Sequence, residues 1–409
     1  MNNKNIIYIL SDQHNPFVMR NAGDAFVRTP NLDLLYKNGT CFDNCYCSAP
    51  LCVPSRAGIM TGQLPSHNGV FNNMQALSSC NATLPASLTD SGYETVLSVG
   101  WDQWHGFEKH FVGDITPSFV GEDNEEAIYG SFKRSSGQNL TSIRKSGAGN
   151  SAVLDYDADV LNTACSYLES RNDKRPLFMT IGFYGPHCPY IAPKELYQYY
   201  YDILPEIDFP SKEQRDAMHP AEKLWFENRK IDQVTKADVK RIRAAYYSMV
   251  ELLDSYIGRI IDTVDKTLGL DNTLIVYSSD HGDNIGEHGY FWKTNFYDAA
   301  SRVPLVFMGN GIEKGRRIKE LSSLLDIAPT LTSYSSSDDL PSVDGKNLMP
   351  VLYGNEEPDK NRVVVSMCSD IKGDNPSLML RKGQYKYVMH AGYEMPQLFD
   401  MASDPHECH

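Results

Sequence analysis

The chain is short of long apolar runs and of basic residues. No apolar stretch in its 409 residues approaches the roughly 20 residues of a membrane helix, so we expect no membrane span. Lys and Arg together number 38 against 52 Asp and Glu, a net charge of −14 that disfavours nucleic acid or an anionic membrane as a partner. A protein with this balance has to concentrate positive charge locally if it binds an anion.

The sequence also lacks a recognisable cysteine framework and a leader segment. Its nine cysteines are an odd number, and no spacing is typical of paired disulfides or of a zinc site. Cys41, Cys45 and Cys47 are close together but fall in an apparent strand, so we interpret them as structural. The N-terminus shows no long apolar region and no small-residue cleavage site, and the sequence as it stands predicts a cytoplasmic protein.

Short apolar runs alternate with segments of helical periodicity. Ile6–Leu10 and Thr273–Tyr277 are predicted buried strands, and Thr235–Lys266 is the clearest helix because its apolar residues recur at spacings of three and four. Further strands are predicted at Thr40–Tyr46, Glu94–Val99, Pro176–Phe183 and Val303–Met308, and further helices after Pro30, around Arg56, at Tyr156–Arg171 and at Asp326–Tyr334. This alternation predicts an α/β fold with a large, mainly parallel sheet flanked by helices.

The chain is long enough for a second, smaller domain. A polar stretch at Ser335–Asp339 could be a linker, and short strands separated by Gly-containing turns follow it. We therefore predict a catalytic α/β domain at residues 1–335 and a small antiparallel α+β domain at residues 336–409.

One segment combines a thiol, a helix start and a guanidinium. In Cys52-Val53-Pro54-Ser55-Arg56 the proline suits the first turn of a helix, which places Cys52 at a helix N-terminus, where unpaired N–H groups favour an anion. Arg56 lies one turn further on the same face and can bind an oxyanion through two parallel hydrogen bonds. The alternative is a small buried cysteine before an ordinary helix.

Two predicted strands end in aspartates. Asp12 follows the first strand and Asp280 follows the strand at Thr273–Tyr277, and two carboxylates directed at one spot repel unless a cation lies between them. Oxygen-rich ligation suits Ca²⁺ or Mg²⁺ better than zinc, and His281 and Gln13 could complete the shell. We expect Ca²⁺ rather than Mg²⁺, with carboxylate oxygens of Asp12 and Asp280 within roughly 5 Å of each other. Taken singly, each Asp could also be a turn or cap residue.

Three motifs together carry a family resemblance. They are Cys52–Arg56 with Thr61-Gly62 closing the segment, Ser279-Asp280-His281-Gly282, and Pro186-His187-Cys188-Pro189. The combination resembles the type I, formylglycine-dependent sulfatases of the alkaline phosphatase superfamily. The resemblance implies hydrolysis of a small sulfate monoester to alcohol and inorganic sulfate, with a maturation enzyme converting Cys52 to formylglycine. The hydrated aldehyde would attack sulfur, and the product would collapse to aldehyde and sulfate.

The resemblance also implies a role for individual residues. The metal ligands fall on Asp12, residue 52, Asp280 and His281, with Gln13 as a further candidate. Arg56 and Lys293 would hold the sulfate oxygens, and His187 would protonate the departing alcohol, a role that suits imidazole. Asn73 resembles a residue that approaches the site in choline sulfatases and phosphonate monoester hydrolases, and the phrase Asp102–Glu108 also resembles the choline sulfatases.

The sequence departs from this family in two places. The family's Gly-Lys-x-His run is absent between Ser98 and Asp102. If the chain is continuous there, the loss of one sulfate-binding lysine predicts weak or absent sulfatase activity; the alternative is that a loop is missing from this sequence. Relatives usually continue beyond a turn like Asp404-Pro405, so we expect the small domain to be incomplete.

Three other functions stay open at this point. One is a phosphonate or phosphate ester hydrolase on the same fold, the second is a catalytically impaired protein that binds sulfate esters, and the third is a structural α/β protein without bound cation or altered Cys52. The sequence does not specify whether the substrate is a sugar, choline or aryl ester, because specificity lies on variable loops. It leaves a homo-oligomeric state open.

Overall fold

The computed structural model describes residues 4–99, 111–115, 140–207, 209–369 and 376–408. Within them, one large sheet has the strand order β11-β2-β12-β8-β1-β6-β3-β4, with β13 also paired to β2. Its strands are β1 (Asn5–Asp12), β2 (Thr40–Tyr46), β3 (Glu94–Val99), β4 (Gly113–Asp114), β6 (Leu177–Pro186), β8 (Thr273–Ser279), β11 (Arg302–Val303), β12 (Leu305–Met308) and β13 (Arg316–Ser323). β1 is parallel to β6 and β8, and β3 to β4 and β6, whereas β12 is antiparallel to both of its neighbours. The predicted, mainly parallel sheet is confirmed.

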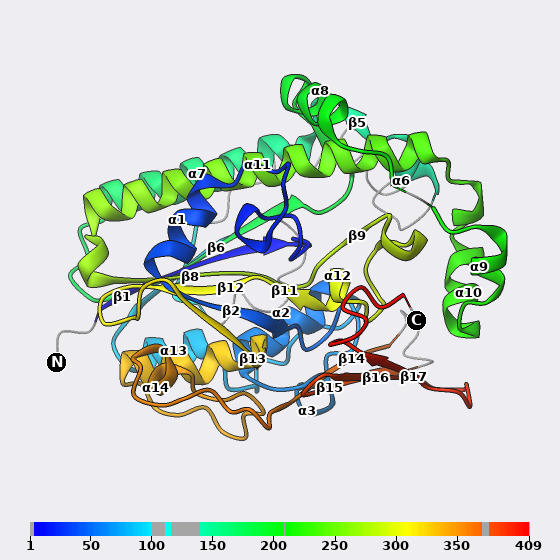
Figure 1. The fold of residues 1–409 in the computed structure, drawn as a ribbon. Helices are drawn as coiled ribbons and strands as arrows, with labels where there is room; N and C mark the ends of the chain where they lie inside the picture. The colour runs from blue at the N-terminus through cyan, green and yellow to red at the C-terminus, as the bar shows by residue number, and fades with distance from the viewer. Residues whose placement is uncertain (1–3, 100–110, 116–139, 208, 370–375, 409) are drawn as a thin grey trace.

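Helices cover both faces of this sheet (Figure 1). One face packs against α1 (Pro30–Asn38), α7 (Ala152–Ser170) and α11 (Lys236–Thr267), and the other against α2 (Cys52–Thr61), α4 (Leu84–Asp90) and α13 (Ile327–Ser335). The side chains of β1 divide between these two cores, with Ile7 and Ile9 on the α11 side and Ile6, Tyr8 and Leu10 on the α2 side. A strand buried on both faces needs a continuous apolar run, and the sequence of β1 supplies one.

The small sheet near the C-terminus is antiparallel, as predicted. Its strands β14 (Val363–Cys368), β15 (Ser377–Lys382), β16 (Tyr385–His390) and β17 (Gln397–Asp400) pair in chain order. The sequence did not predict β17, and the division of the chain at residue 335 stays a prediction.

The remaining elements are short and lie mainly in the connections. The helices are α3 (Pro65–Asn68), α6 (Leu140–Arg144), α8 (Lys194–Ile203), α9 (Lys212–Asp216), α10 (Pro220–Asn228), α12 (Asp298–Ser301) and α14 (Met349–Leu352), and the strands are β5 (Gly147–Ala148), β7 (Ile191–Ala192), β9 (Asn284–Ile285) and β10 (Phe291–Trp292).

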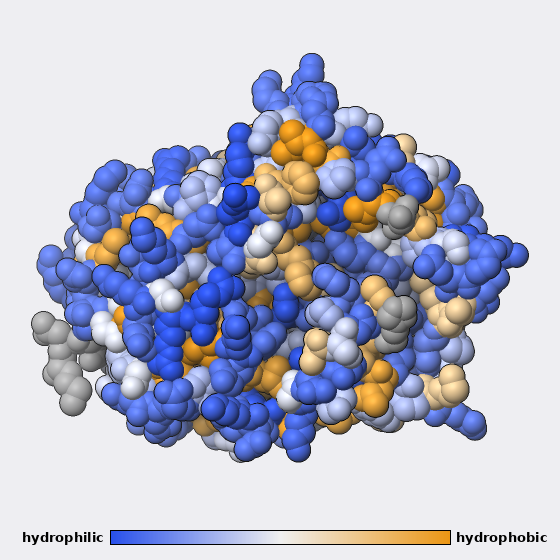
Figure 2. All heavy atoms as spheres, viewed as in Figure 1, coloured by the Kyte–Doolittle hydropathy of each residue, from blue (hydrophilic) through white to orange (hydrophobic). Residues whose placement is uncertain are grey.

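Figure 2 shows a face of the molecule on which hydrophilic side chains predominate and apolar ones form scattered patches. Among the described residues, none of the helices has the length and apolar character to span a bilayer.

Candidate active site

The two predicted aspartates meet at one edge of the sheet. β1 and β8 are adjacent and parallel, and Ser11 lies opposite Ser279, so both strands end at the same level. Asp12 and Asp280 follow directly and are fully buried. Ligand sites of open parallel sheets form at this edge.

Helix α2 brings Cys52 and Arg56 to the same edge. Cys52 is the first residue of α2, with Pro54 in its first turn. The Arg56 guanidinium donates from Nη2 to Asp12 Oδ2 at 2.7 Å and from Nε to Asp280 Oδ2 at 3.0 Å. We expected its hydrogen-bonding fork to face an oxyanion, but these two N–H groups face the carboxylates instead. Arg56 therefore fixes the aspartates relative to one another and balances part of their charge.

His281 presents a lone pair to this cluster. Its Nδ1 lies 2.9 Å from the Gly282 carbonyl oxygen, which only accepts hydrogen bonds, so Nδ1 carries the hydrogen. Burial lowers the pKa of His281 well below its usual value, so Nε2 is an unprotonated acceptor at neutral pH. That atom lies 3.6 Å from Asp12 Oδ1 and 3.5 Å from Asp280 Oδ1, which are also acceptors.

Buried acceptor atoms that crowd together in this way fit a cation. Ligand atoms of Asp12, Cys52, Asp280 and His281 lie within 4.8 Å of one another, which confirms the expected approach of the two carboxylates. The second ring nitrogen of His281 is held by a backbone carbonyl, an arrangement typical of metal-ligating histidines. Two carboxylates, an imidazole and the side chain of residue 52 together form a possible site for a divalent metal ion.

Lys293 lies against the thiol of Cys52. Its Nζ is 2.8 Å from Cys52 Sγ and 2.8 Å from Gln13 Oε1, and it is 3.8 Å from Asp12 Oδ1. The backbones of Trp292 and Thr294 on either side are left-handed, with φ of 65° and 71°. Such strained conformations in non-glycine residues are concentrated at functional sites.

The charges in the cluster shift one another's pKa values. Burial and the Asp280 carboxylate raise the pKa of Asp12, although Lys293 and Arg56 oppose them. Burial and Asp12 raise the pKa of Cys52 to about 12, so it is a neutral thiol at neutral pH. Burial disfavours the charged form of Lys293, but the negative groups around it, a Cys52 thiolate and the two aspartates, would outweigh burial, and the pKa of Lys293 lies above its usual value.

His187 is buried in the loop that follows β6. Its Nδ1 lies 2.5 Å from the Cys188 carbonyl oxygen, and the Tyr184 ring packs edge-on against the imidazole at 4.6 Å. Burial and the positive charge of Lys293 lower the pKa of His187 well below its usual value. The free ring nitrogen of the neutral form is Nε2, because Nδ1 donates to the carbonyl.

Asn73 lies at the start of α2. Its Oδ1 accepts a hydrogen bond of 3.0 Å from Val53 N–H, the residue after Cys52. The side chain satisfies one of the free N–H groups of the helix end and lies beside residue 52.

Sequence reasoning missed two buried aspartates near the site. Asp157 on α7 accepts hydrogen bonds from Tyr184 N–H at 2.8 Å and Gly185 N–H at 2.7 Å, just before His187. Asp283 accepts from Gln13 Nε2 at 2.7 Å. The position of Asp283 two residues after His281 was the one available signal, whereas Asp157 gave none.

Two sequence predictions fall on residues that the structure does not describe. The join between Ser98 and Asp102, where the Gly-Lys-x-His run is missing, lies outside the described residues beyond Val99. The phrase at residues 102–108 lies outside them as well. Both stay predictions from the sequence.

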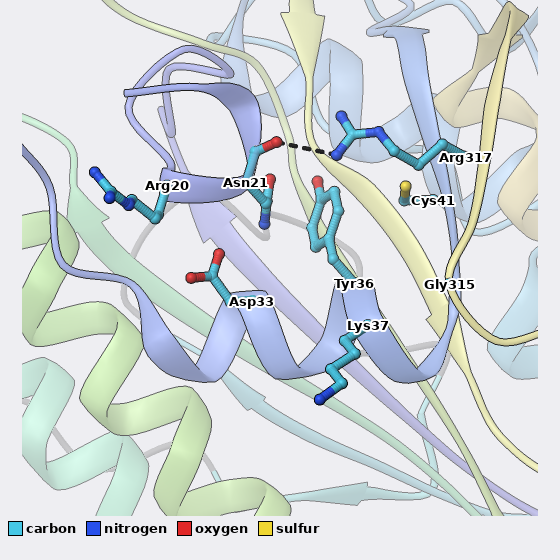
Figure 3. A pocket seen from close by; sticks show the side chains of 8 residues that line it. All are labelled: Arg20, Asn21, Asp33, Tyr36, Lys37, Cys41, Gly315 and Arg317. Atoms are coloured by element: carbon cyan, nitrogen blue, oxygen red, sulfur yellow. Dashed lines mark hydrogen bonds between the residues drawn. The ribbon is translucent and has the colours of Figure 1, made fainter. Parts of the chain in front are cut away.

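A separate cavity of 310 Å³ lies between α1 and the starts of β2 and β13 (Figure 3). It is lined by Arg20, Asn21, Asp33, Tyr36, Lys37, Cys41, Gly315 and Arg317. Arg317 is already bound to the Asn21 carbonyl at 3.0 Å and to Asp43 at 2.7 Å. The cavity shares no residue with the candidate active site.

Fold and site define a class of protein. A parallel sheet carries a buried acceptor cluster at its strand ends, with a lysine and an arginine around one residue at a helix N-terminus. This is an α/β protein with a possible metal-binding group beside two basic side chains.

The comparisons with known proteins identify the family. The sulfatase family model matches residues 4–336, and the model of the C-terminal region of N-sulphoglucosamine sulphohydrolase matches residues 286–409. The chain is 34% identical to a choline-sulfatase of Rhizobium meliloti, across 98% of this chain and 81% of that protein. It is 27% identical to human arylsulfatase K, across 98% of this chain and 78% of that protein. The chain belongs to the sulfatase family, the type I sulfatases of the alkaline phosphatase superfamily, and is a sulfuric ester hydrolase.

Solved structures show the same fold. A phosphonate monoester hydrolase of Agrobacterium radiobacter aligns with a TM-score of 0.82 at 24% identity, covering 99% of this chain and 91% of that one. A 2-O GAG sulfatase aligns with a TM-score of 0.80 at 21% identity, covering 100% of this chain and 87% of that one. These similarities support the architecture, including the small C-terminal sheet.

Proposed function

We propose that this protein hydrolyses a sulfate monoester through a formylglycine formed from Cys52, with Ca²⁺ held by Asp12, Asp280, His281 and residue 52. The observation that carries the proposal is the convergence of buried acceptors and the Lys293 ammonium on Cys52. A single buried residue between a cation site and a lysine is where an ester's anionic group and its attacking atom have to meet.

The bound groups would supply chemistry that the amino acids lack. Formylglycine formed from Cys52 would supply a hydrated aldehyde as nucleophile, and Ca²⁺ held by Asp12, Asp280 and His281 would supply positive charge for the sulfate oxygens. Gln13 is a further candidate ligand, since its backbone N–H donates to Asp280 Oδ1 at 3.1 Å and holds the side chain at the same edge.

Two basic residues of this chain would act during the reaction, one by binding a sulfate oxygen and one by holding the two carboxylates in place. Lys293 is fixed beside residue 52, where its ammonium can bind a sulfate oxygen without moving. Arg56 keeps the two carboxylates in place and neutralises them in part, a role that we infer from its hydrogen bonds to both. With the Gly-Lys-x-His run missing, Lys293 carries much of the sulfate binding, and we expect a slower enzyme than its relatives.

His187 would deliver a proton to the departing alcohol from Nε2. The imidazole is neutral in the protein alone, because burial and Lys293 disfavour the charged form. A bound sulfate ester brings a negative charge into the same space and favours the protonated form. Asn73 next to residue 52 is placed to contact the ester.

The substrate class to test first comes from the relatives. The choline-sulfatase relative suggests choline sulfate, and the arylsulfatase relative suggests an aryl sulfate. An aryl phosphonate ester tests the rival function, because a tetrahedral phosphonate carries a similar charge pattern.

The deciding experiment combines mass spectrometry with turnover. Protein made with a maturation enzyme should show a loss of about 18 mass units on the peptide that carries residue 52. That preparation should hydrolyse one of the sulfate esters, and the variant Cys52→Ala should lose at least about 10³-fold in kcat. Protein from a host without the maturation enzyme is the matched control. Full turnover by an unmodified thiol would overturn the formylglycine proposal, and faster turnover of the phosphonate would favour the rival.

A further inference from the structure

The side-chain amide of Gln13 has two neighbours of opposite hydrogen-bonding character. Its Oε1 accepts from Lys293 Nζ at 2.8 Å, and its Nε2 donates to Asp283 Oδ2 at 2.7 Å. An ammonium group can only donate and a carboxylate accepts, so the flipped amide would oppose donor to donor and acceptor to acceptor. Lys293 and Asp283 therefore both favour this orientation of the amide, and Asp283 holds its Nε2 end.

Asp283 is itself held without touching the acceptor cluster. It is fully buried, and Tyr190 OH donates to both of its oxygens, at 2.8 and 3.1 Å. Among the described residues, no basic group lies within ion-pair distance of this carboxylate. Burying a carboxylate without a basic partner costs folding free energy, which an apolar residue of similar size would avoid.

Gln13 has little freedom apart from this bond. Its backbone is left-handed with a φ of 70°, its N–H donates to Asp280, and its carbonyl oxygen accepts from Tyr246 OH at 2.6 Å. The backbone is thus fixed, and rotation of the terminal amide is the motion that remains.

We propose that Asp283, held by Tyr190, is a positioning residue that sets the Gln13 amide and thereby fixes the Lys293 ammonium beside residue 52. The proposal rests on the proposed function, in which Lys293 binds a sulfate oxygen. Lys293 has a flexible four-carbon stem, and Gln13 Oε1 is the oxygen that bonds its ammonium most closely. Loss of that acceptor would let the ammonium move, and a displacement of about 1 Å can cost about 10²-fold in rate.

The test compares Asp283→Leu with Asp283→Asn in Ca²⁺-loaded protein whose residue 52 is converted. Leucine has similar size but no acceptor, whereas asparagine can place its oxygen against Gln13 Nε2 and keep the amide orientation. We expect Asp283→Leu to lose about 10²-fold in kcat on 4-nitrophenyl sulfate and about 10-fold in calorimetric affinity for inorganic sulfate. Asp283→Asn should keep at least about a third of both, because it retains the orienting acceptor.

Two further variants distinguish a loss of positioning from a loss of folding. Tyr190→Phe keeps the carboxylate but removes the hydroxyl that holds it, so an intermediate loss of about fivefold is expected. Asp254 is a matched buried carboxylate on α11 that accepts from Asn31 and Leu32 N–H, away from the site. Asp254→Leu should lower the melting temperature without changing kcat or sulfate affinity.

The outcomes separate this proposal from the proposed function. Equal kcat and sulfate affinity in Asp283→Leu and Asp283→Asn would overturn the positioning role while leaving the reaction intact. A wild-type protein that turns over no sulfate ester would overturn the proposed function, and the sulfate affinities of the two variants would still decide whether Asp283 positions Lys293.

Discussion

At the residue scale, acceptors and donors are distributed unevenly around position 52. Asp12, Asp280 and His281 present lone pairs to one side, and Lys293 presents an ammonium to another. The first side suits a cation and the second an anion. This division of roles gives separate predictions for the metal and for the proton donor.

Calcium should stabilise the folded protein through the acceptor cluster. Free Ca²⁺ at about 100 times its dissociation constant should add about 2.7 kcal/mol to the free energy of unfolding, because the ion binds only the folded site. Thermal unfolding with and without a chelator measures the shift. Asp280→Asn should lose most of it, whereas Asp254→Asn, on α11, should retain it. A full calcium shift in Asp280→Asn would place the ion elsewhere.

The effect of removing His187 should depend on the alcohol that departs. A general acid contributes typically 10²–10⁴-fold, and it matters most when the leaving oxygen is strongly basic. His187→Ala should therefore lose about 10²-fold or more in kcat on an alkyl sulfate and less than about 10-fold on 4-nitrophenyl sulfate. Equal losses on both esters, measured with the same preparation, would show that His187 binds substrate rather than donating a proton.

At the element scale, the position of His187 depends on a contact between α7 and the end of β6. Asp157 on α7 accepts two consecutive backbone N–H groups, those of Tyr184 and Gly185. A Cβ on residue 185 would lie 2.9 Å from Asp157 Oδ2, so glycine permits this close approach. The loop with His187 begins at this fixed point.

The Asp157 contact predicts a pH-dependent stability. Burial raises the pKa of Asp157 to about 7, although the two N–H groups oppose this rise. Its pKa in the unfolded chain is about 3.9, so between about pH 4 and 7 the folded state binds more protons and stability falls as the pH rises. Asp157→Asn has no such proton, and relative to it the wild type should lose up to about 4 kcal/mol across this window. Urea unfolding of both proteins at several pH values measures the difference, and parallel pH curves would contradict it.

The same scale shows how much the sequence could predict. β2 and β3 were predicted with the bounds that the structure has, because a buried strand needs a local apolar run. β13, Arg-Arg-Ile-Lys-Glu-Leu-Ser-Ser, has no such run and forms because β2 offers a parallel partner. Partners distant in sequence likewise decide side-chain roles: Arg56 on α2 pairs with Asp12 at the end of β1 and with Asp280 just after β8. The burial of Asp157 depends on the packing of α7. Local sequence patterns predict neither the ion pairs of Arg56 nor the burial of Asp157.

At the scale of the whole molecule, the small C-terminal sheet is bound to the segment that follows Lys293. Lys386 on β16 is fully buried, and its Nζ contacts Asp298 Oδ1 at 2.5 Å, Glu407 Oε1 at 2.6 Å and the Phe296 carbonyl at 2.9 Å. Glu407 also accepts from Asp298 N–H at 2.7 Å. A charged network therefore joins the small sheet to α12, just beyond Lys293.

The network predicts that the small sheet supports catalysis as well as folding. Lys386→Met leaves Glu407 buried without its cation and leaves Asp298 with Arg302 at 3.4 Å, and breaking such a group costs about 3–5 kcal/mol. Urea unfolding should show this loss, and Lys386→Met combined with Glu407→Gln should recover part of it because the unpaired charge of Glu407 is gone.

The kcat on a sulfate ester tests whether the network around Lys386 also fixes the position of Lys293. Asp298 and the Phe296 carbonyl lie in the segment that leads from Lys293 to β11, so freeing them should loosen the lysine and lower kcat on a sulfate ester by about 10-fold under conditions where the variant stays folded. Lys346→Met is the control, since Lys346 forms an exposed ion pair with Asp359 and should change stability by less than about 1 kcal/mol. If Lys386→Met is destabilised but retains full kcat, the small sheet stabilises the fold without fixing the position of Lys293. If kcat and sulfate affinity both fall, the small sheet also fixes the position of Lys293.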